Sequence, residues 1–270
     1  MHHKVSKCNG ARWHIHAVGS AYARAMTAEQ ETLVRSATEW AVVPFVPEVT
    51  LRTAAEPFGL WDRTERDAPP FWAFPWAGGQ GLARYILDHP ETVAGHHVLD
   101  VASGSGLVAI AAAKAGARTA LAADIDENAL IAIALNAAAN NTPQVVPRSV
   151  DLAAASLTVG CLGMVSQDSG QDTADSGTAA ADLVATLAAD VFRAPDVVLA
   201  GDVFYQRDLA AMALTFLKAA RRAGAAVFVA DPARAFVPRA ELTAVLTYEI
   251  PVLPVLEDTQ VKTVTIYSLP

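Results

Sequence analysis

Cysteine is scarce in this chain of 270 residues, which has only two, Cys8 and Cys161. Two cysteines so far apart form neither a disulfide framework nor a metal cluster, and this usage is typical of the reducing cytoplasm. Long apolar runs are also missing. A membrane-spanning helix needs about 18 consecutive apolar residues, and Asp, Lys or Asn interrupts each apolar stretch before that length. No continuous apolar segment follows the basic residues near the N-terminus, so a secretory signal is not expected. We therefore predict a cytoplasmic protein with no metal site and no membrane contact.

Basic residues are fewer than acidic ones, with 20 Lys and Arg against 28 Asp and Glu and a formal net charge of -8. A protein that binds the phosphate backbone of a nucleic acid needs a basic surface, so no nucleic-acid partner is expected. The acidic balance is compatible with a basic protein partner, although most acidic proteins are acidic for solubility alone. Apolar residues make up 53% of the chain. That share is enough to build the core of one large α/β domain or two small ones.

Three zones differ in composition. Residues 1–25 mix His, Ser, Gly and Lys without periodicity and predict a poorly ordered extension, with Met26 as an alternative start of the chain. Residues 26–95 predict a helical and aromatic cover segment, in which a helix over residues 27–41 begins at Thr27 as its N-cap. Residues 96–270 predict the core domain, interrupted at 153–190 by a segment of mainly Ser, Asp, Gly and Ala. That insertion holds too few large apolar side chains to offset its ordering entropy, so we expect a mobile loop.

Strand and helix signals alternate through the core domain. The strand-like run HHVLDVA is followed by the helix-like GLVAIAAAKAGA, which Gly116 ends, and RTALAADID and ENALIAIALNAAANN repeat the pattern. The pattern resumes after the insertion with PDVVLAGDVFY, a helix over residues 207–223, and AAVFVADPARAF. This spacing predicts parallel βαβ units in a doubly wound α/β sheet. The final TVTIYSLP alternates as an antiparallel edge strand does.

A glycine-rich turn, DVASGSG, ends the first of these strands. Gly104 and Gly106 let the backbone turn sharply and leave room for a ligand, while Asp100 ends the strand beside them. The next strand ends at Asp124. In dinucleotide-binding sites, an acidic residue at about this spacing after the glycine-rich turn accepts hydrogen bonds from two ribose hydroxyls. Ala109 occupies the position of the third glycine in the dinucleotide-binding fingerprint, where alanine is an allowed variant. A nicotinamide-dependent oxidoreductase is therefore an alternative interpretation.

The DVASGSG loop followed by AADID resembles the first motif and its acidic partner in the seven-strand S-adenosylmethionine-dependent methyltransferases. The segment PFWAFPWAGGQGLARYILDHPE and the later GDVFY narrow the resemblance to the family of electron transfer flavoprotein beta subunit lysine methyltransferases. The resemblance implies a Rossmann-like methyltransferase fold with a seven-strand, mostly parallel sheet, S-adenosylmethionine as cofactor, and a lysine of the flavoprotein subunit or of a ribosomal protein as substrate. It implies that the following residues contact the cofactor: Trp76, Gln80, Asp100, Ala102, Gly104, Gly106, Asp124, Ile125, Asp151 and Gly201.

Asp202 and Tyr205 in GDVFY are the candidate catalytic residues, and they match the D-x-x-Y motif of that family. They follow an apolar strand, so both emerge at the rim of the sheet, where a ligand binds. A carboxylate can hold an incoming lysine ammonium by a charge-assisted hydrogen bond. An aromatic wall desolvates the amine and attracts a cationic sulfonium. The alternative is that Asp202 caps the next helix and that Tyr205 is a packing residue.

Other residues near the strand ends are weaker candidates. Asp231 and Arg234 follow the next strand on the same rim, but Asp-Pro after a strand is also an ordinary turn. Asp126 is expected to be a helix N-cap, and Trp72 to cover a sheet edge. A small-molecule N-methyltransferase with the same fold remains a second alternative.

Overall fold

The computed structural model describes residues 28–55, 60, 70–152, 195–257 and 259–270. The predicted N-terminal extension and the predicted mobile insertion lie outside these residues. Among the helices of the described ranges, none is both long enough and apolar enough to cross a membrane.

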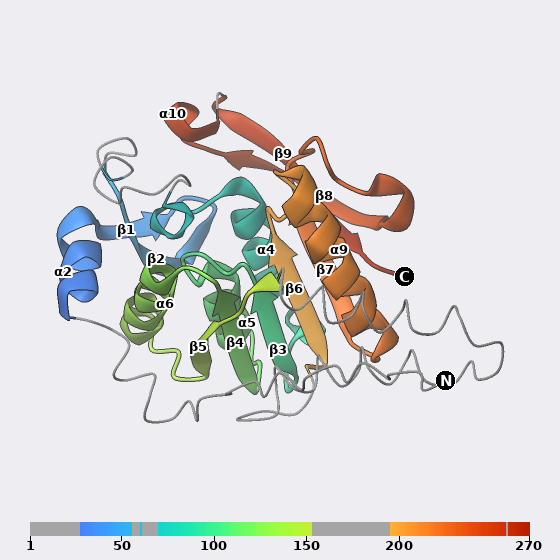
Figure 1. Ribbon diagram of the computed structural model, residues 1–270, viewed down its shortest axis with the longest axis horizontal. Coiled ribbons are helices and arrows are strands. Elements are labelled where there is room, and N and C mark those ends of the chain that lie inside the picture. Colours follow the sequence, from blue (N-terminus) through green and yellow to red (C-terminus); the bar gives the residue numbers. More distant parts are fainter. Residues whose placement is uncertain (1–27, 56–59, 61–69, 153–194, 258) are drawn as a thin grey trace, which may run out of the picture.

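A seven-stranded sheet in the order β5-β4-β3-β6-β7-β9-β8 forms the centre of the protein (Figure 1). Its strands are β3 (His97–Val101), β4 (Thr119–Asp124), β5 (Val145–Ser149), β6 (Val197–Gly201), β7 (Ala226–Asp231), β8 (Thr243–Pro251) and β9 (Val261–Ser268). Strands β3 to β7 pair in parallel, whereas β9 pairs antiparallel with both β7 and β8. The strand order reverses at β3, because β4 and β5 extend from one of its edges and β6 and β7 from the other. This sheet confirms the predicted doubly wound fold, whose ligands bind where the order reverses.

Helices cover both faces of the sheet. The helices that pack on the sheet include α4 (Ala77–Asp88), α5 (Leu107–Lys114), α6 (Glu127–Ala139) and α9 (Arg207–Arg222). Val98 of β3 belongs to the core cluster that includes residues of α4, α5 and α6, while its neighbour Leu99 belongs to the cluster that includes residues of α9. Successive residues of a strand point to opposite faces, so an apolar run such as VLDVA fills both cores at once.

Two expected features of the helices are present. Asp126 precedes α6, and its side chain accepts a hydrogen bond from the backbone N–H of Asn128, as predicted for an N-cap. Gly116 follows α5 with a φ of +94°, the left-handed conformation that ends a helix.

The predicted helix over residues 27–41 is wrong beyond residue 37. Helix α2 (Ala28–Ala37) ends there, and β1 (Glu39–Val43) pairs with β2 (Val46–Thr53) as a hairpin. The guanidinium of Arg52 donates hydrogen bonds to the backbone oxygens of Arg35 and Thr38, and so satisfies carbonyls at the end of the helix. The residue that ends the helix thus comes from the far strand of the hairpin, and nothing local to residues 38–41 reveals it.

The C-terminal strand is also misplaced by the sequence-based prediction. TVTIYSLP is antiparallel as expected, but β9 lies inside the sheet, between β7 and β8, and β8 is the edge. Strand β8 is missing from the prediction. Helix α10 (Pro254–Glu257) lies between β8 and β9 in the chain, and Figure 1 shows it in red near the turn of that hairpin. Among the described residues, short 3₁₀ helices lie at Phe71–Ala73, Pro90–Thr92 and Arg239–Glu241.

Candidate functional site

A cavity of about 950 Å³ opens at the carboxyl ends of β3, β4 and β6. Its size lies within the range of about 300–1,000 Å³ that small-molecule and cofactor sites occupy. Most of the predicted site residues line it: Trp76, Asp100, Ala102, Gly104, Asp124, Ile125, Asp151, Gly201, Asp202 and Tyr205. The structure thus brings together one group of residues from the glycine loop and another from the end of β6.

The glycine loop lies between β3 and α5. The φ of Gly104 is +55° and that of Gly106 is +83°, which glycine adopts without steric strain. A Cβ atom at Gly106 would lie 3.2 Å from Ile133, so the second glycine also lets α6 pack closely. Gly106 itself does not line the cavity, and its place in the structure is to close the turn before α5.

Asp100 fixes the loop from below. Its Oδ2 accepts hydrogen bonds from the Ser103 hydroxyl at 2.5 Å and from the backbone N–H of Ala109 at 3.2 Å. Burial raises the pKa of Asp100 to about 7 because the charged form loses its hydration, and these hydrogen bonds oppose the shift. The carboxyl group is therefore both a structural anchor and a group that titrates near neutral pH.

Asp124 joins the end of β4 to the glycine loop. Its Oδ2 accepts the backbone N–H of Gly104 at 2.8 Å, and its Oδ1 accepts that of Asp126 at 3.0 Å. Each carboxylate oxygen has two lone pairs, so the group keeps capacity for a hydrogen bond from a ligand in the cavity. Burial raises the pKa of Asp124, against these backbone hydrogen bonds. Ile125 follows with an exposed side chain on the same wall.

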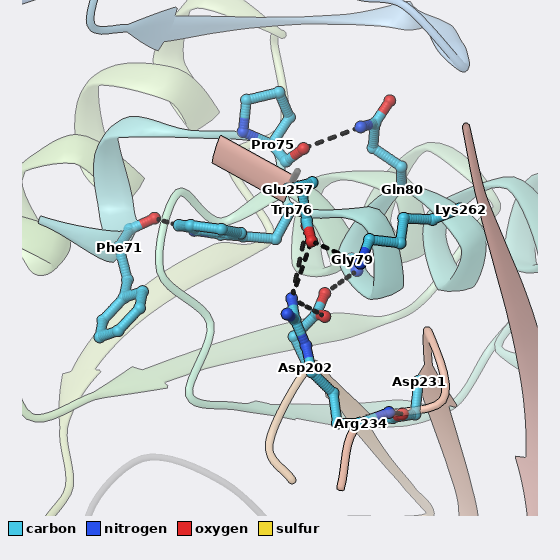
Figure 2. Close-up of polar contacts among 10 residues, drawn as sticks. All are labelled: Phe71, Pro75, Trp76, Gly79, Gln80, Asp202, Asp231, Arg234, Glu257 and Lys262. Atoms are coloured by element: carbon cyan, nitrogen blue, oxygen red, sulfur yellow. Dashed lines mark hydrogen bonds and ion pairs between the residues drawn. The ribbon is translucent and has the colours of Figure 1, made fainter. Parts of the chain in front are cut away.

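The aromatic segment before α4 forms another wall. The Trp76 indole donates a hydrogen bond to the Phe71 carbonyl at 2.9 Å, and the two rings lie 5.7 Å apart (Figure 2). Trp76 and Phe71 line the cavity. Trp72 was expected to cover a sheet edge, but it is buried against residues of α6 and also lines the cavity.

Gln80 does not line the cavity. Its amide donates to the Pro75 carbonyl at 2.8 Å and its side-chain oxygen accepts the backbone N–H of Phe45 at 3.2 Å. The side chain is 2% exposed and fastens α4 to the β1–β2 hairpin. The position implied by the resemblance is thus close to the site in sequence but serves packing in this structure.

Asp202 directly follows β6, whereas Asp124 ends β4 on the other side of β3. Its φ is +57°, an uncommon conformation for a residue other than glycine, and it marks a backbone held in place by its surroundings. Oδ2 accepts the backbone N–H of Gly79 in α4 at 3.1 Å, and Oδ1 pairs with the Arg234 guanidinium at 3.1 Å. Burial raises the pKa of Asp202 and the charge of Arg234 opposes this. The sequence predicted that the Asp202 carboxylate holds the lysine ammonium, but it did not predict that this carboxylate is already paired with Arg234 and Gly79.

Arg234 also pairs with Glu257, which in turn lies 3.7 Å from the Lys262 ammonium (Figure 2). Although burial lowers the pKa of Arg234, Asp202 and Glu257 raise it above its ordinary value. Glu257 and Lys262 were not singled out from the sequence. They belong to α10 and β9, and no local pattern indicates that this hairpin reaches the end of β6.

Tyr205 lies against the aromatic segment. Its ring is 5.0 Å from that of Phe71, and both rings line the cavity. Burial raises the pKa of the phenol and the charge of Asp124 adds to the shift, so the hydroxyl stays protonated at neutral pH. The arrangement offers hydrogen-bond acceptors for hydroxyl groups at one end and an aromatic surface beside a carboxylate at the other.

Residues 85–166 match the model of the ribosomal protein L11 methyltransferase family (PrmA). The electron transfer flavoprotein beta subunit lysine methyltransferase of Xenopus laevis is 32% identical over 196 residues, which are 71% of this chain and 65% of the relative. The protein of the same name from Homo sapiens is 45% identical over 97 residues, 35% of this chain and 37% of the relative. The matched regions thus span less than two thirds of the length of these curated relatives.

Among solved structures, the magnesium protoporphyrin IX methyltransferase of Synechocystis PCC 6803 with bound S-adenosylhomocysteine has a TM-score of 0.45 and is 12% identical. That match covers 79% of this chain and 94% of the solved one. The fold assignment rests on the strand order itself. The strand order and the sequence matches identify the chain as one of the S-adenosylmethionine-dependent methyltransferases and as a relative of the electron transfer flavoprotein beta subunit lysine methyltransferases.

Proposed function

We propose that this protein transfers methyl groups from S-adenosylmethionine to lysine side chains of a protein. The observation that carries the proposal is that one cavity is lined both by Asp124 and the glycine loop, here called its first end, and by Asp202 and Tyr205, here called its second end. The first end suits a nucleoside and the second suits an amine. The two ends together suit a reaction between a nucleoside cofactor and an amine.

The residues of the first end fit the cofactor. Asp124 has lone pairs for ribose hydroxyls, and the positive φ of Gly104 leaves its N–H bonded to that same carboxylate. Ile125 and Asp151 line the wall beyond Asp124 and would flank the adenine. When bound, S-adenosylmethionine supplies an electrophilic methyl group on a sulfonium. Trp76 and Tyr205 are the aromatic side chains that would lie near this cation.

The residues of the second end would align the substrate. The rings of Tyr205 and Phe71 exclude water from the amine, because their surface is apolar and they contact each other. Asp202 would accept a hydrogen bond from the amine and hold its lone pair toward the methyl group. Such catalysis is mainly proximity and alignment, and it needs no covalent intermediate with the protein.

The substrate that we favour is the electron transfer flavoprotein beta subunit, because the curated relatives carry that name. The net charge of -8 supports a protein partner with basic residues over a nucleic acid. We place the protein in the cytoplasm, since two distant cysteines suit a reducing compartment.

The test is incubation of the purified chain with methyl-labelled S-adenosylmethionine and recombinant electron transfer flavoprotein beta subunit. We expect label on lysine residues of the subunit, located by mass spectrometry, and no label with heat-treated enzyme. Ribosomal protein L11 is tested in parallel, and label on that protein alone would replace the proposed substrate. Label only on small amines would instead favour a small-molecule N-methyltransferase. Stabilisation against heat by NAD but not by S-adenosylhomocysteine would contradict the assigned cofactor, since a ligand stabilises the state that binds it.

A further inference from the structure

Four charged side chains form a continuous cluster, and two of them, Asp202 and Arg234, line the cavity. The Arg234 guanidinium lies 3.1 Å from the Asp202 carboxylate and 3.3 Å from that of Glu257. Lys262 lies 3.7 Å from Oε2 of Glu257. The side chains of Asp202 and Glu257 are only 12% and 3% exposed, so water screens these charges weakly. Two acids and two bases leave the cluster without a net charge.

Backbone hydrogen bonds in the loops after β6 and β7 hold Arg234 in this position. Oδ1 of Asp231, at the end of β7, accepts the backbone N–H of Arg234 at 2.6 Å. Ala233 between them has a φ of +64°, so the chain turns back sharply toward β6. Asp202 in turn donates its backbone N–H to the Ala230 carbonyl at 3.0 Å. The loops after β6 and β7 are thus linked at both backbone and side chain, and the guanidinium is fixed against Asp202 rather than free to move.

The other groups that face the cluster are few among the described residues. The N-terminus of α4 directs the N–H of Gly79 to Asp202, which favours the charged carboxylate. Tyr205 lies beside it in the cavity wall with a protonated hydroxyl. Asp231 is buried behind Arg234 and does not line the cavity. From the cavity, an incoming amine therefore meets Asp202 together with its counter-ion.

We propose that Arg234 cancels the charge of Asp202 toward the cavity, so that the site favours the neutral amine of the substrate lysine over its ammonium form. This inference rests on the proposed function. A lone carboxylate would stabilise the ammonium, which has no lone pair for the reaction. A carboxylate paired with a guanidinium still accepts a hydrogen bond from the neutral amine, and Asp202 keeps lone pairs for this. Arg234 is accordingly a positioning and charge-setting residue, and Asp202 is the group that touches the substrate.

Methyl transfer requires the neutral amine of the substrate lysine. The ammonium first releases a proton to solvent. The nitrogen lone pair of the neutral amine forms the new bond to the methyl carbon, the carbon–sulfur bond breaks, and its electron pair stays on the sulfur of the leaving thioether. The product is an N-methylammonium, which loses a proton before any further transfer. The pKa of the bound lysine therefore sets the pH at which kcat falls on the acidic side of its pH profile. This part of the profile is called the acid limb.

Two substitutions in the cluster change its charge in opposite directions. Arg234→Gln leaves it one unit more negative, which stabilises the bound ammonium and moves the acid limb of kcat to higher pH. Glu257→Gln leaves it one unit more positive and moves the same limb to lower pH. A unit charge at this range corresponds to about one pH unit in each direction. A purely structural role predicts lower kcat in both variants with no opposite movement of the limbs.

The experiment measures kcat and KM from pH 6 to 10 with the flavoprotein beta subunit as substrate. The variants are Arg234→Gln, Arg234→Lys and Glu257→Gln. Arg35→Gln serves as the matched control, because this arginine pairs with Glu31 on the exposed surface of α2. Binding of S-adenosylhomocysteine by each variant reports whether the fold and the cofactor end are intact. At pH 7 we expect Arg234→Gln to lower kcat about tenfold and to lower KM as well, since it binds the ammonium more tightly. Arg234→Lys keeps the charge and should keep the wild-type limb.

The inference is overturned if the acid limbs do not move, or if they move in the same direction in Arg234→Gln and Glu257→Gln. In that case methylation by the wild type still supports the proposed function. If Arg234→Gln fails to bind S-adenosylhomocysteine, the limb of Glu257→Gln decides alone. An absence of methylation by the wild type overturns the proposed function and this inference with it.

Discussion

The carboxylate of Asp202 accepts a hydrogen bond from the backbone N–H of Gly79 at 3.1 Å, although 123 residues separate them in the chain. Gly79 lies in the first turn of α4, where backbone N–H groups have no partner within the helix. The bond fixes the aromatic segment before α4 against the rim after β6. It also leaves no room beside it, because a Cβ atom at Gly78 would lie 2.5 Å from Oδ2 of Asp202 and 2.8 Å from the Ala230 carbonyl oxygen.

Gly78→Ala should therefore damage the site and the fold, whereas the fold should tolerate Gly79→Ala. The nearest atom to a Cβ at Gly79 is a Leu107 methyl at 3.9 Å, an ordinary contact. We expect Gly78→Ala to reduce kcat/KM at least tenfold and to destabilise the fold by about 1–3 kcal/mol, since neither the carboxylate nor the backbone oxygen can yield freely. Gly79→Ala should unfold at the same denaturant concentration or slightly above, because alanine favours helices by up to about 1 kcal/mol. Chemical denaturation and steady-state kinetics of the two variants check this, and equal losses in both would contradict the close packing.

Asp124→Ala should abolish tight binding of the cofactor. The substitution removes the carboxylate that can accept the ribose hydroxyls, and it also releases the N–H of Gly104 in the glycine loop. Hydrogen bonds to a charged group contribute about 1.5–3 kcal/mol each, so affinity should fall at least tenfold. Calorimetric titration with S-adenosylhomocysteine measures it. Glu127→Gln, which removes a neighbouring negative charge in the first turn of α6, is the control. Binding by Asp124→Ala within about twofold of wild type would mean that the end of β4 does not hold the ribose.

Tyr205→Phe should reduce kcat/KM only about tenfold, because it keeps the ring that contacts Phe71 at 5.0 Å and removes a hydroxyl alone. Tyr205→Ala should reduce it by about 10²-fold or more, since the substrate amine then lies beside water. Asp202→Asn should likewise lose about 10²-fold, with cofactor affinity unchanged. Kinetics on the protein substrate at saturating cofactor distinguish these effects. Full methylation activity in Asp202→Asn would show that this residue only joins α4 to β6.

The glycine loop and the three acidic residues near strand ends were predictable because their signals are local. Asp100, Asp124 and Asp202 lie at or next to the end of an apolar strand, and parallel strands bring their carboxyl ends to one edge of the sheet. The side chains that pair with them were not predictable in the same way. Arg234 was predicted only as a weaker candidate that follows an Asp-Pro turn. Its pairing with Asp202 depends on a backbone turn at Ala233.

Long-range pairing explains the other differences from the sequence-based prediction. Residues 39–43 form a strand because β2 supplies their hydrogen-bond partners, and a helical pattern in the preceding residues cannot reveal this. Glu257 reaches the site because β9 pairs between β7 and β8. Gln80 was placed by resemblance, but its partner Phe45 lies 35 residues away in a turn that the sequence did not predict. In each case a partner distant in sequence determines the position.

Stability should fall as the pH rises from about 5 to 7, in the absence of any ligand. Burial raises the pKa of Asp100 to about 7, and burial likewise raises that of Asp231 to about 7, whereas an unfolded aspartate titrates near 3.9. In this window the folded state binds protons that the unfolded state has released. The stabilisation is therefore complete below about pH 4 and is lost as the pH rises through 7.

Each of these two carboxyl groups contributes a slope of at most about 1.4 kcal/mol per pH unit. Asp100→Asn should remove one of the two contributions, because the amide has no proton to lose while its oxygen can still accept the hydrogen bonds of Ser103 and Ala109. Urea denaturation at pH 5, 6 and 7 measures the free energy of unfolding, with Asp208→Asn on the exposed surface of α9 as the control. We expect a flatter pH dependence in Asp100→Asn and an unchanged one in the control. A wild-type stability that rises between pH 5 and 7 would mean that Asp100 is charged in the folded protein and that its hydrogen bonds outweigh its burial.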